Sequence, residues 1–158
     1  MSCQVSNATK DDVESLIQVY SSADLYHNGE EASWFVKSYF DYHHIKVVKQ
    51  GKEVVGAIFW NAVEEKHHGL TNIQDLYIDE KFRRKGLGER LLRSSIEDMK
   101  KLYAKNDYLL RKVIVTTGEY NKPARNLYEK IGFQLTAILP DLFSKRENEL
   151  VYILTLNL

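Results

Sequence analysis

The chain has a single cysteine, Cys3, among its 158 residues, and it has no excess of either charge. One cysteine excludes an internal disulfide and fits a reducing compartment. Lysine plus arginine and aspartate plus glutamate number 22 each, so no overall field draws the chain to nucleic acid or to an anionic membrane. Any phosphate ligand must therefore be held by a local group of basic side chains.

Long apolar runs are also missing. No stretch approaches the roughly 20 residues of a membrane-spanning helix, and residues 1–10 lack the apolar core of a signal peptide. The sequence has no internal repeat, no low-complexity tract and no linker rich in Pro, Gly or Ser. We therefore expect one soluble domain spanning residues 1–158, located in the cytoplasm and not associated with a membrane.

Hydrophobic periodicity predicts helices and strands in a mixed order. The expected strands cover residues 3–8, 45–49, 53–61, 70–78, 111–117, 133–139 and 149–156. The expected helices cover residues 10–20, 30–42, 86–104 and 121–131. Sequential strands near the start and crossover helices later are typical of an α/β fold.

A basic, glycine-containing turn between a strand and a helix is the feature around which the chain is organised. The strand ends at Ile78, and Arg83-Arg84-Lys85-Gly86-Leu87-Gly88 then leads into the helix. Glycine lets the backbone approach a ligand without a Cβ in the way. The first N–H groups of a helix have no partner inside the helix, and basic side chains can pair with phosphate oxygens. This turn is therefore suited to a phosphate group.

Three phosphate-binding patterns can be compared with this turn. A Walker loop needs Lys-Ser or Lys-Thr after its glycine, but Glu89-Arg90 follows Gly88. A dinucleotide fingerprint needs a third glycine, where Leu91 stands. The Arg-x-x-Gly-x-Gly loop that closes over the pyrophosphate of coenzyme A is matched without a gap by Arg83, Gly86 and Gly88.

A second block, Asn121–Phe133, follows the next strand. Four of its residues fall at helical spacing on one face: Asn121, Ala124, Arg125 and Tyr128. An amide, a small side chain and a phenol suit a ligand wall better than a core. Leu127 and Ile131 are expected to point toward the sheet instead, and Gly132 to end the helix.

Together the two blocks resemble the GNAT superfamily of N-acetyltransferases. Its members carry Arg/Gln-x-x-Gly-x-Gly/Ala after one strand and Asn-x-x-Ala-x-x-x-Tyr-x-x-x-Gly-Phe after the next. The resemblance covers Leu70–Phe133, and the element order fits nearly the whole chain. It implies a mixed, mostly antiparallel central sheet of about six or seven strands with four helices, splayed between the central strands to hold acetyl-CoA. One departure is Asp79-Glu80, which stands where the family often has proline after the central strand.

The resemblance also implies a set of cofactor contacts. These are Leu76, Tyr77, Ile78, Arg83, Arg84, Lys85, Gly86, Leu87, Gly88, Glu89, Asn121, Ala124, Tyr128 and Lys130. The Ile78 N–H would donate to the oxyanion, a contact whose loss typically costs about 3–4 kcal/mol. Tyr128 would protonate the departing thiolate; the alternative is an ordinary helix aromatic, one of ten tyrosines.

The proton acceptor for the attacking amine is less clearly marked. The substrate-facing positions of the central strand are expected to be Asn72 and Gln74, which cannot take a proton at neutral pH, while Asp75 falls on the opposite face. We favour a water relay ordered by Asn72 or Gln74, with Glu64 just upstream as a further candidate. Adjacent histidines on a strand point to opposite faces, so the pairs at 43–44 and 67–68 predict no metal site.

The function that these motifs predict is transfer of an acetyl group from acetyl-CoA to a primary amine by direct attack on the thioester. Five acidic residues near the expected acceptor side favour a small, polyamine-like cation: Asp24, Glu30, Glu31, Glu64 and Glu65. A protein N-terminus or lysine is the alternative acceptor, and a non-catalytic CoA-binding regulatory module is the second alternative. The aromatics of residues 34–42 either form a homodimer contact or pack in the core. Nucleic acid is not an expected partner.

Overall fold

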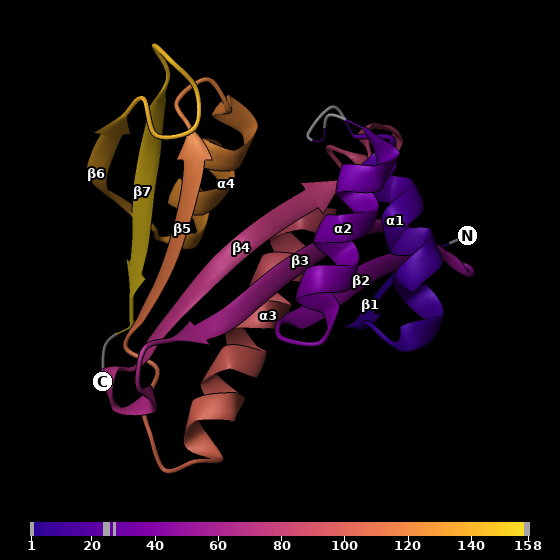
Figure 1. Ribbon diagram of the computed structural model, residues 1–158. Coiled ribbons are helices and arrows are strands. Elements are labelled where there is room, and N and C mark those ends of the chain that lie inside the picture. The colour runs from indigo at the N-terminus through magenta and orange to yellow at the C-terminus, as the bar shows by residue number, and fades with distance from the viewer. Residues whose placement is uncertain (1, 24–25, 27, 157–158) are drawn as a thin grey trace. The chain divides into compact units, whose positions relative to one another are not determined.

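The computed structural model describes residues 2–23, 26 and 28–156 (Figure 1). Within them the chain is a mixed α/β fold with one seven-stranded sheet, in the order β1-β2-β3-β4-β5-β7-β6. The strands are β1 Cys3–Asn7, β2 His44–Gln50, β3 Glu53–Val63, β4 Leu70–Ile78, β5 Lys112–Gly118, β6 Gln134–Pro140 and β7 Asn148–Thr155. The α-helices are α1 Val13–Ser21, α2 Gly29–Phe40, α3 Leu87–Ala104 and α4 Lys122–Ile131.

The sheet is mostly antiparallel, as the resemblance implies. The pairs β1–β2, β2–β3, β5–β7 and β6–β7 are antiparallel, whereas β4 and β5 run parallel. The parallel ladder joins Leu70–Ile73 to Lys112–Val115. Parallel neighbours need a crossover between them, and α3 supplies it. Among the described residues, no helix has both the length and the apolar character needed to cross a membrane.

The chain divides into two compact units that are interleaved in the sequence. The first unit extends to Asn61 and includes Gln74–Ser95. The second comprises Ala62–Ile73 and the chain from Ile96 onward. Both β4 and α3 therefore have residues in each unit. The expectation of one domain over residues 1–158 stays a prediction.

The core of the first unit lies between a helical layer and the sheet. Buried apolar residues of α1 and α2 pack against those of β2 and β3, and Figure 1 shows these two helices beside one another in front of the strands. Phe35 and Val36 of α2 belong to this core, whereas Trp34 and Tyr42 are 66% and 82% exposed. Core packing thus accounts for only part of the aromatic segment at residues 34–42, and a homodimer contact stays a prediction.

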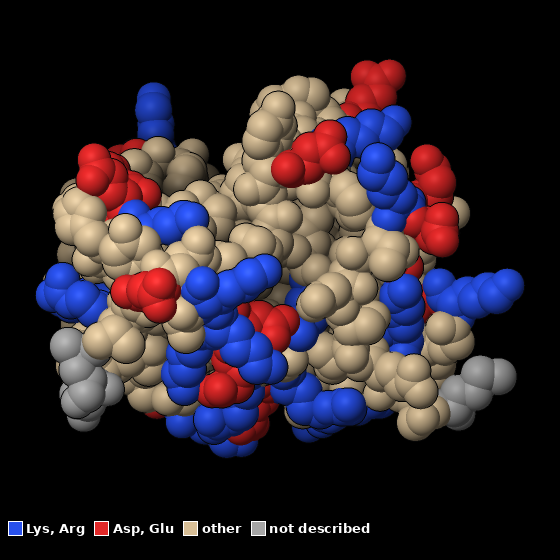
Figure 2. Space-filling model, turned by 90° about the horizontal axis from the view of Figure 1, so that it is seen from below, with Lys and Arg blue, Asp and Glu red and all other residues tan. Residues whose placement is uncertain are grey.

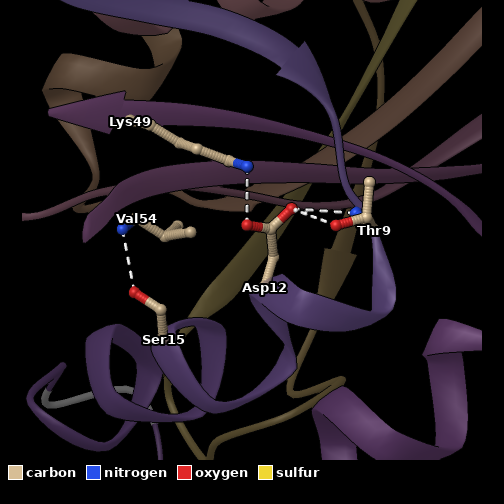
Figure 3. A network of polar contacts seen from close by, with 5 residues as sticks. All are labelled: Thr9, Asp12, Ser15, Lys49 and Val54. Atoms are coloured by element: carbon tan, nitrogen blue, oxygen red, sulfur yellow. Dashed lines mark hydrogen bonds and ion pairs between the residues drawn. The ribbon is translucent and has the colours of Figure 1, made fainter. Parts of the chain in front are cut away.

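A polar network fastens α1 to the β2–β3 hairpin (Figure 3). The Lys49 ammonium lies 2.6 Å from Asp12, whose other carboxylate oxygen accepts hydrogen bonds from the Thr9 backbone N–H and hydroxyl. The Ser15 hydroxyl accepts a bond of 2.8 Å from the Val54 N–H. The β2–β3 register shifts between Val48 and Lys49. The Ser15 hydroxyl therefore satisfies the Val54 N–H beside the irregular part of the ladder.

In the second unit, α4 packs on β7. The Tyr152 hydroxyl of β7 donates to the Glu129 carboxylate of α4 over 2.8 Å. The helix ends at Gly132, whose φ of +109° lies in the left-handed region that favours glycine. The sequence predicted that end. On α3, the Tyr103 hydroxyl donates to the Leu70 carbonyl at the start of β4.

Candidate active site

The backbone N–H of Ile78, at the end of β4, points away from the neighbouring strand β3. The Asp79 N–H donates to the Val55 carbonyl of β3 over 2.9 Å. Successive amides of a strand point to opposite sides, so the Ile78 N–H points away from β3. Tyr77 is buried, and the side chains of Leu76 and Ile78 are half-buried. The residue predicted as the oxyanion donor therefore has its N–H outside the β3 ladder.

Arg83 ties the basic turn to that strand end. Its Nε donates to the Ile78 carbonyl over 2.9 Å, and its guanidinium carbon lies 5.5 Å from the centroid of the Tyr77 ring. A weaker ion pair of 3.4 Å joins it to Glu80. Glu80 belongs to a short 3-10 turn, Glu80–Phe82, that Asp79 caps by accepting from the Lys81 N–H. One arginine thus holds together the strand end and the beginning of the turn.

The turn after Arg83 has an unusual backbone. Arg84 has φ +63° and Gly86 has φ +73°, and a non-glycine residue in the left-handed region is uncommon and strained. Arg84, Lys85 and Gly86 are exposed, and no atom lies within 4 Å of a Cβ placed on Gly86. The Lys85 ammonium lies 5.0 Å from the centroid of the Phe82 ring.

The N-terminus of α3 completes this group of donors. The Gly86 carbonyl accepts from the Arg90 N–H over 3.1 Å, so the amides of Leu87 and Gly88 come before the first intrahelical bond. Leu87 is buried, whereas Gly88 and Glu89 are half-buried. Arg83, Arg84 and Lys85 come directly before these amides in the chain, and cationic side chains with helix-terminal amides are groups that bind phosphate oxygens in proteins.

The second block of the sequence prediction forms α4, in the second unit. Asn121 caps the helix, its side-chain oxygen accepting from the Ala124 N–H over 3.3 Å. We expected Asn121 to contact the cofactor, and its capping bond was not predicted. Ala124 is half-buried and Lys130 is exposed.

Tyr128 is the buried side chain of α4, 4% exposed. Its ring centroid lies 5.7 Å from that of Phe133 and 5.9 Å from that of Tyr152. Leu127 and Ile131, which were expected to face the sheet, are only half-buried. The helix face that was interpreted as a ligand wall therefore also supplies the helix's packing residue, because a phenol buries a large ring while keeping one polar atom.

The acetyltransferase (GNAT) family model matches residues 11–133 of this chain. The chain belongs to the GNAT family. Members of this family are acetyltransferases, and the family's acetyl donor is acetyl-CoA. The matched region includes both motif blocks.

Two curated relatives act on different classes of amine. A spermine/spermidine N(1)-acetyltransferase of Bacillus subtilis is 29% identical over 76 residues, spanning 48% of this chain and 47% of that enzyme, about half its length. An N-alpha-acetyltransferase of Sulfurisphaera tokodaii is 29% identical over 126 residues, 70% of this chain and 72% of that protein. An N-acetyltransferase structure from Staphylococcus aureus superposes with a TM-score of 0.78 at 19% identity, covering 99% of this chain and 100% of that one. That likeness shows the GNAT fold alone.

The residues predicted for the proton relay differ in exposure, and they do not all belong to the same unit. Gln74 is exposed in the first unit; in the second, Asn72 is half-buried and Glu64 is exposed with φ +57°. Asp24 lies outside the described residues. Within those residues, no group of three or more His, Cys, Asp or Glu side chains is placed to hold a metal ion. Figure 2 shows Lys and Arg side chains interspersed with Asp and Glu over the face in view.

One acidic residue has a setting that sequence analysis missed. Asp75 of β4 accepts a hydrogen bond from the hydroxyl of Tyr20 of α1. Burial raises the pKa of Asp75 to about 6, although hydrogen bonds from Tyr20 and the Leu76 amide act to lower it. A carboxylate between Ile73 and Tyr77, on the buried side of a strand, was the signal available in the sequence.

Proposed function

We propose that this GNAT enzyme acetylates the primary amine of a small cationic molecule, polyamine-like in chemistry. The observation that carries the proposal is the donor set of Arg83–Gly88 at the N-terminus of α3. That set suits the pyrophosphate of acetyl-CoA, which when bound supplies the thioester. The polyamine class is supported by the name of the Bacillus relative. It is also supported by the exposed carboxylates of Glu30, Glu31, Glu64 and Glu65.

In this proposal the chain's residues divide the work of binding. The backbone of Leu76–Ile78 and the turn Arg83–Gly88, with Glu89 behind it, hold the donor. Asn121, Ala124 and Lys130 add contacts from α4. The capping bond of Asn121 supports a fixed position for its amide.

Two residues would act on the reacting atoms. The Ile78 N–H would donate to the oxyanion, which is supported by its direction away from β3. Tyr128 would donate a proton to the departing sulfur, which is supported by the two rings that hold its own ring in place. With ordinary pKa values of about 10 for a phenol and about 8.5 for a thiol, this transfer is mildly uphill and depends on positioning. A water relay ordered by Asn72 or Gln74 would carry the amine's proton away.

Two alternatives remain as proposals. A protein N-terminus is the second acceptor class, because the Sulfurisphaera relative is named for that activity. The other alternative is a CoA-binding module without catalysis, because neither Asn72 nor Gln74 can take a proton at neutral pH.

The deciding experiment measures free thiol released from acetyl-CoA across polyamines, other small amines and short peptides. We expect polyamine-like amines to give the fastest release, and Tyr128→Phe to lower turnover at least about 100-fold. Tyr120→Phe is the matched control, because Tyr120 is 73% exposed in the same unit. Calorimetry with acetyl-CoA should give the same affinity for both variants.

Three results would change the assignment. Release with peptides only would move the proposal to the protein acceptor. Binding of acetyl-CoA without release on any amine would leave the non-catalytic module. Full turnover of Tyr128→Phe at every pH would remove Tyr128 as the acid.

A further inference from the structure

Arg125 of α4 is bonded to the turn that precedes its own helix. Its Nη1 donates to the Glu119 carbonyl over 2.9 Å. This turn joins the end of β5 to Asn121, the cap of α4, and it is closed by a bond of 2.9 Å from the Asn121 N–H to the Gly118 carbonyl. The Arg125 side chain therefore reaches back from the start of the helix to the point where the chain leaves β5.

Glu119 is held from β7 as well. Its N–H donates to the Asn148 carbonyl over 2.9 Å, and the Asn148 side-chain amide donates to its carboxylate over 2.8 Å. Glu119 is nevertheless exposed, at a place where water can satisfy each of these groups. Bonds from α4 and from β7 to this one exposed residue indicate that the turn is kept in a single position.

The guanidinium of Arg125 also reaches Tyr152 of β7. A hydrogen bond with the Tyr152 hydroxyl raises the pKa of Arg125. Tyr152 is 0% exposed, and its hydroxyl donates in turn to the Glu129 carboxylate over 2.8 Å. One phenol thus accepts from the cation and donates to the anion. Its ring packs beside that of Tyr128, with centroids 5.9 Å apart.

This network is poorly explained by stability alone. The Nε of Arg125 is buried and has no hydrogen-bond partner among the described residues. A buried donor without an acceptor costs free energy, whereas an apolar side chain of similar length would cover the same surface without that cost. What only a guanidinium offers is a rigid fork of donors that reaches two acceptors on different elements. The connection that Arg125 makes is therefore its distinguishing property.

The position of Tyr128 depends on where α4 begins. Tyr128 lies about two helical turns after Asn121, or 10 Å along the axis, so a small tilt at the turn displaces its hydroxyl. The proton transfer proposed for this phenol is mildly uphill and needs a hydrogen bond to the sulfur. A displacement of about 1 Å is enough to lower such a rate about 100-fold.

We propose that Arg125 is a positioning residue for Tyr128. The inference rests on the proposed function, in which Tyr128 is the acid. By joining the Glu119 carbonyl to the Tyr152 hydroxyl, Arg125 fixes the start of α4 against β7 and so sets the place of the phenol. It gives no proton itself, because a guanidinium stays protonated in proteins.

The test is a double-mutant cycle of Arg125→Gln with Tyr128→Phe, measured as thiol release at saturating acetyl-CoA with the best amine of the panel. Arg125→Gln alone should lower kcat about tenfold or more and change acetyl-CoA affinity by a smaller factor, because it displaces the acid. In the Tyr128→Phe background, the same change should cost less than about twofold. Lys122→Gln removes an exposed cation of the same helix and should keep full kcat.

Arg125→Lys keeps the charge but loses the fork that spans two acceptors, so its kcat should lie between those of the intact enzyme and Arg125→Gln. Thermal unfolding identifies variants that do not fold, and if Arg125→Gln is one of them, Arg125→Lys is carried through the same cycle.

Two results would overturn this inference and leave the proposed function intact. One is full kcat in folded Arg125→Gln, and the other is an equal loss in both backgrounds, which would indicate a structural role. Full turnover of Tyr128→Phe, or thiol release with no amine, would overturn the proposed chemistry and this inference with it.

Discussion

The ammonium of Lys49 lies 2.6 Å from the carboxylate of Asp12, and their side chains are 25% and 6% exposed. This pair joins the β2–β3 hairpin to the start of α1. Lys49→Met should lower the free energy of unfolding by about 2 kcal/mol, because it leaves a buried carboxylate without its cation. Urea denaturation measures the loss, with Lys52→Met, at an exposed position of the hairpin turn, as the control.

The same pair predicts a dependence on pH. Burial acts to raise the pKa of Asp12, but hydrogen bonds from Lys49 and Thr9 and the charge of Lys49 outweigh it, so the pKa is lowered on folding. A lowered pKa stabilises the fold above the unfolded value of about 3.9, and this stability is lost as the pH falls through the folded value. The difference in stability between the intact protein and Lys49→Met should therefore shrink below about pH 4. A constant difference down to pH 2.5 would show that the pair does not control Asp12.

Gly56 of β3 lies where no side chain fits. A Cβ there would come within 2.8 Å of the Tyr77 carbonyl oxygen and 2.5 Å of the Ile78 Cδ1. Gly56→Ala should cost about 1–3 kcal/mol of stability and, because it pushes on Ile78, lower kcat more than it raises KM for acetyl-CoA.

Gly29→Ala is the matched control for Gly56→Ala. Its new Cβ would lie 3.6 Å from the Ser21 Oγ, an ordinary contact, at the first residue of α2. We expect no loss of stability, and a gain of up to about 1 kcal/mol. Equal effects in the two variants would show that the approach of Gly56 to β4 is unimportant.

Arg84 is expected to contribute to the binding of acetyl-CoA and not to the stability of the fold. The residue is exposed in the left-handed region of the turn. Arg84→Gln keeps a long polar side chain at that backbone position but loses a charge-assisted contact to phosphate, so acetyl-CoA affinity should fall about tenfold. Calorimetry at two salt concentrations measures it, and the loss should be smaller at high salt. Lys52→Gln should bind as the intact protein does; a matching loss there would indicate a general charge effect.

The Tyr152 hydroxyl should matter to the orientation of Tyr128. Tyr152→Phe keeps the ring that packs on Tyr128 but removes the bond to Glu129. We expect a loss of about 1–2 kcal/mol in thermal or urea unfolding. Turnover should fall less than in Tyr128→Phe, because the phenol of Tyr128 is still present. A turnover as low as that of Tyr128→Phe would instead make Tyr152 part of the chemistry.

Sequence patterns within single strands, helices and turns were sufficient to predict most of the fold. The strand Leu70–Ile78 agrees with its prediction at both ends, because a β-rich run is bounded by Gly69 and by the charged turn. Gly132 ends α4 as predicted, because few other residues adopt its φ. The GNAT assignment was likewise available from two spaced motifs, and the family match confirms it.

Contacts between distant parts of the chain were not available from local patterns. Tyr20 and Asp75 are 55 residues apart. Face parity showed only that Asp75 lies on the face of β4 opposite Asn72 and Gln74. Face parity does not identify the residues that pack against the other face of β4. Tyr128 gave the opposite difficulty, since its helical spacing marked a ligand face without showing that Phe133 and Tyr152 enclose its ring. The residues predicted for the site stay predictions until variants are measured.

The interleaving of the two units limits how this chain can be recombined. Each unit is built from two separate stretches, with boundaries after Asn61, Ile73 and Ser95. No single cut yields either unit as one continuous fragment, and a chimera that exchanged a unit with a GNAT relative would need a junction at each boundary. Two of those junctions would fall inside β4 and α3. Acceptor specificity in this chain is therefore expected to change by substitution within loops and helix faces and not by exchange of a module.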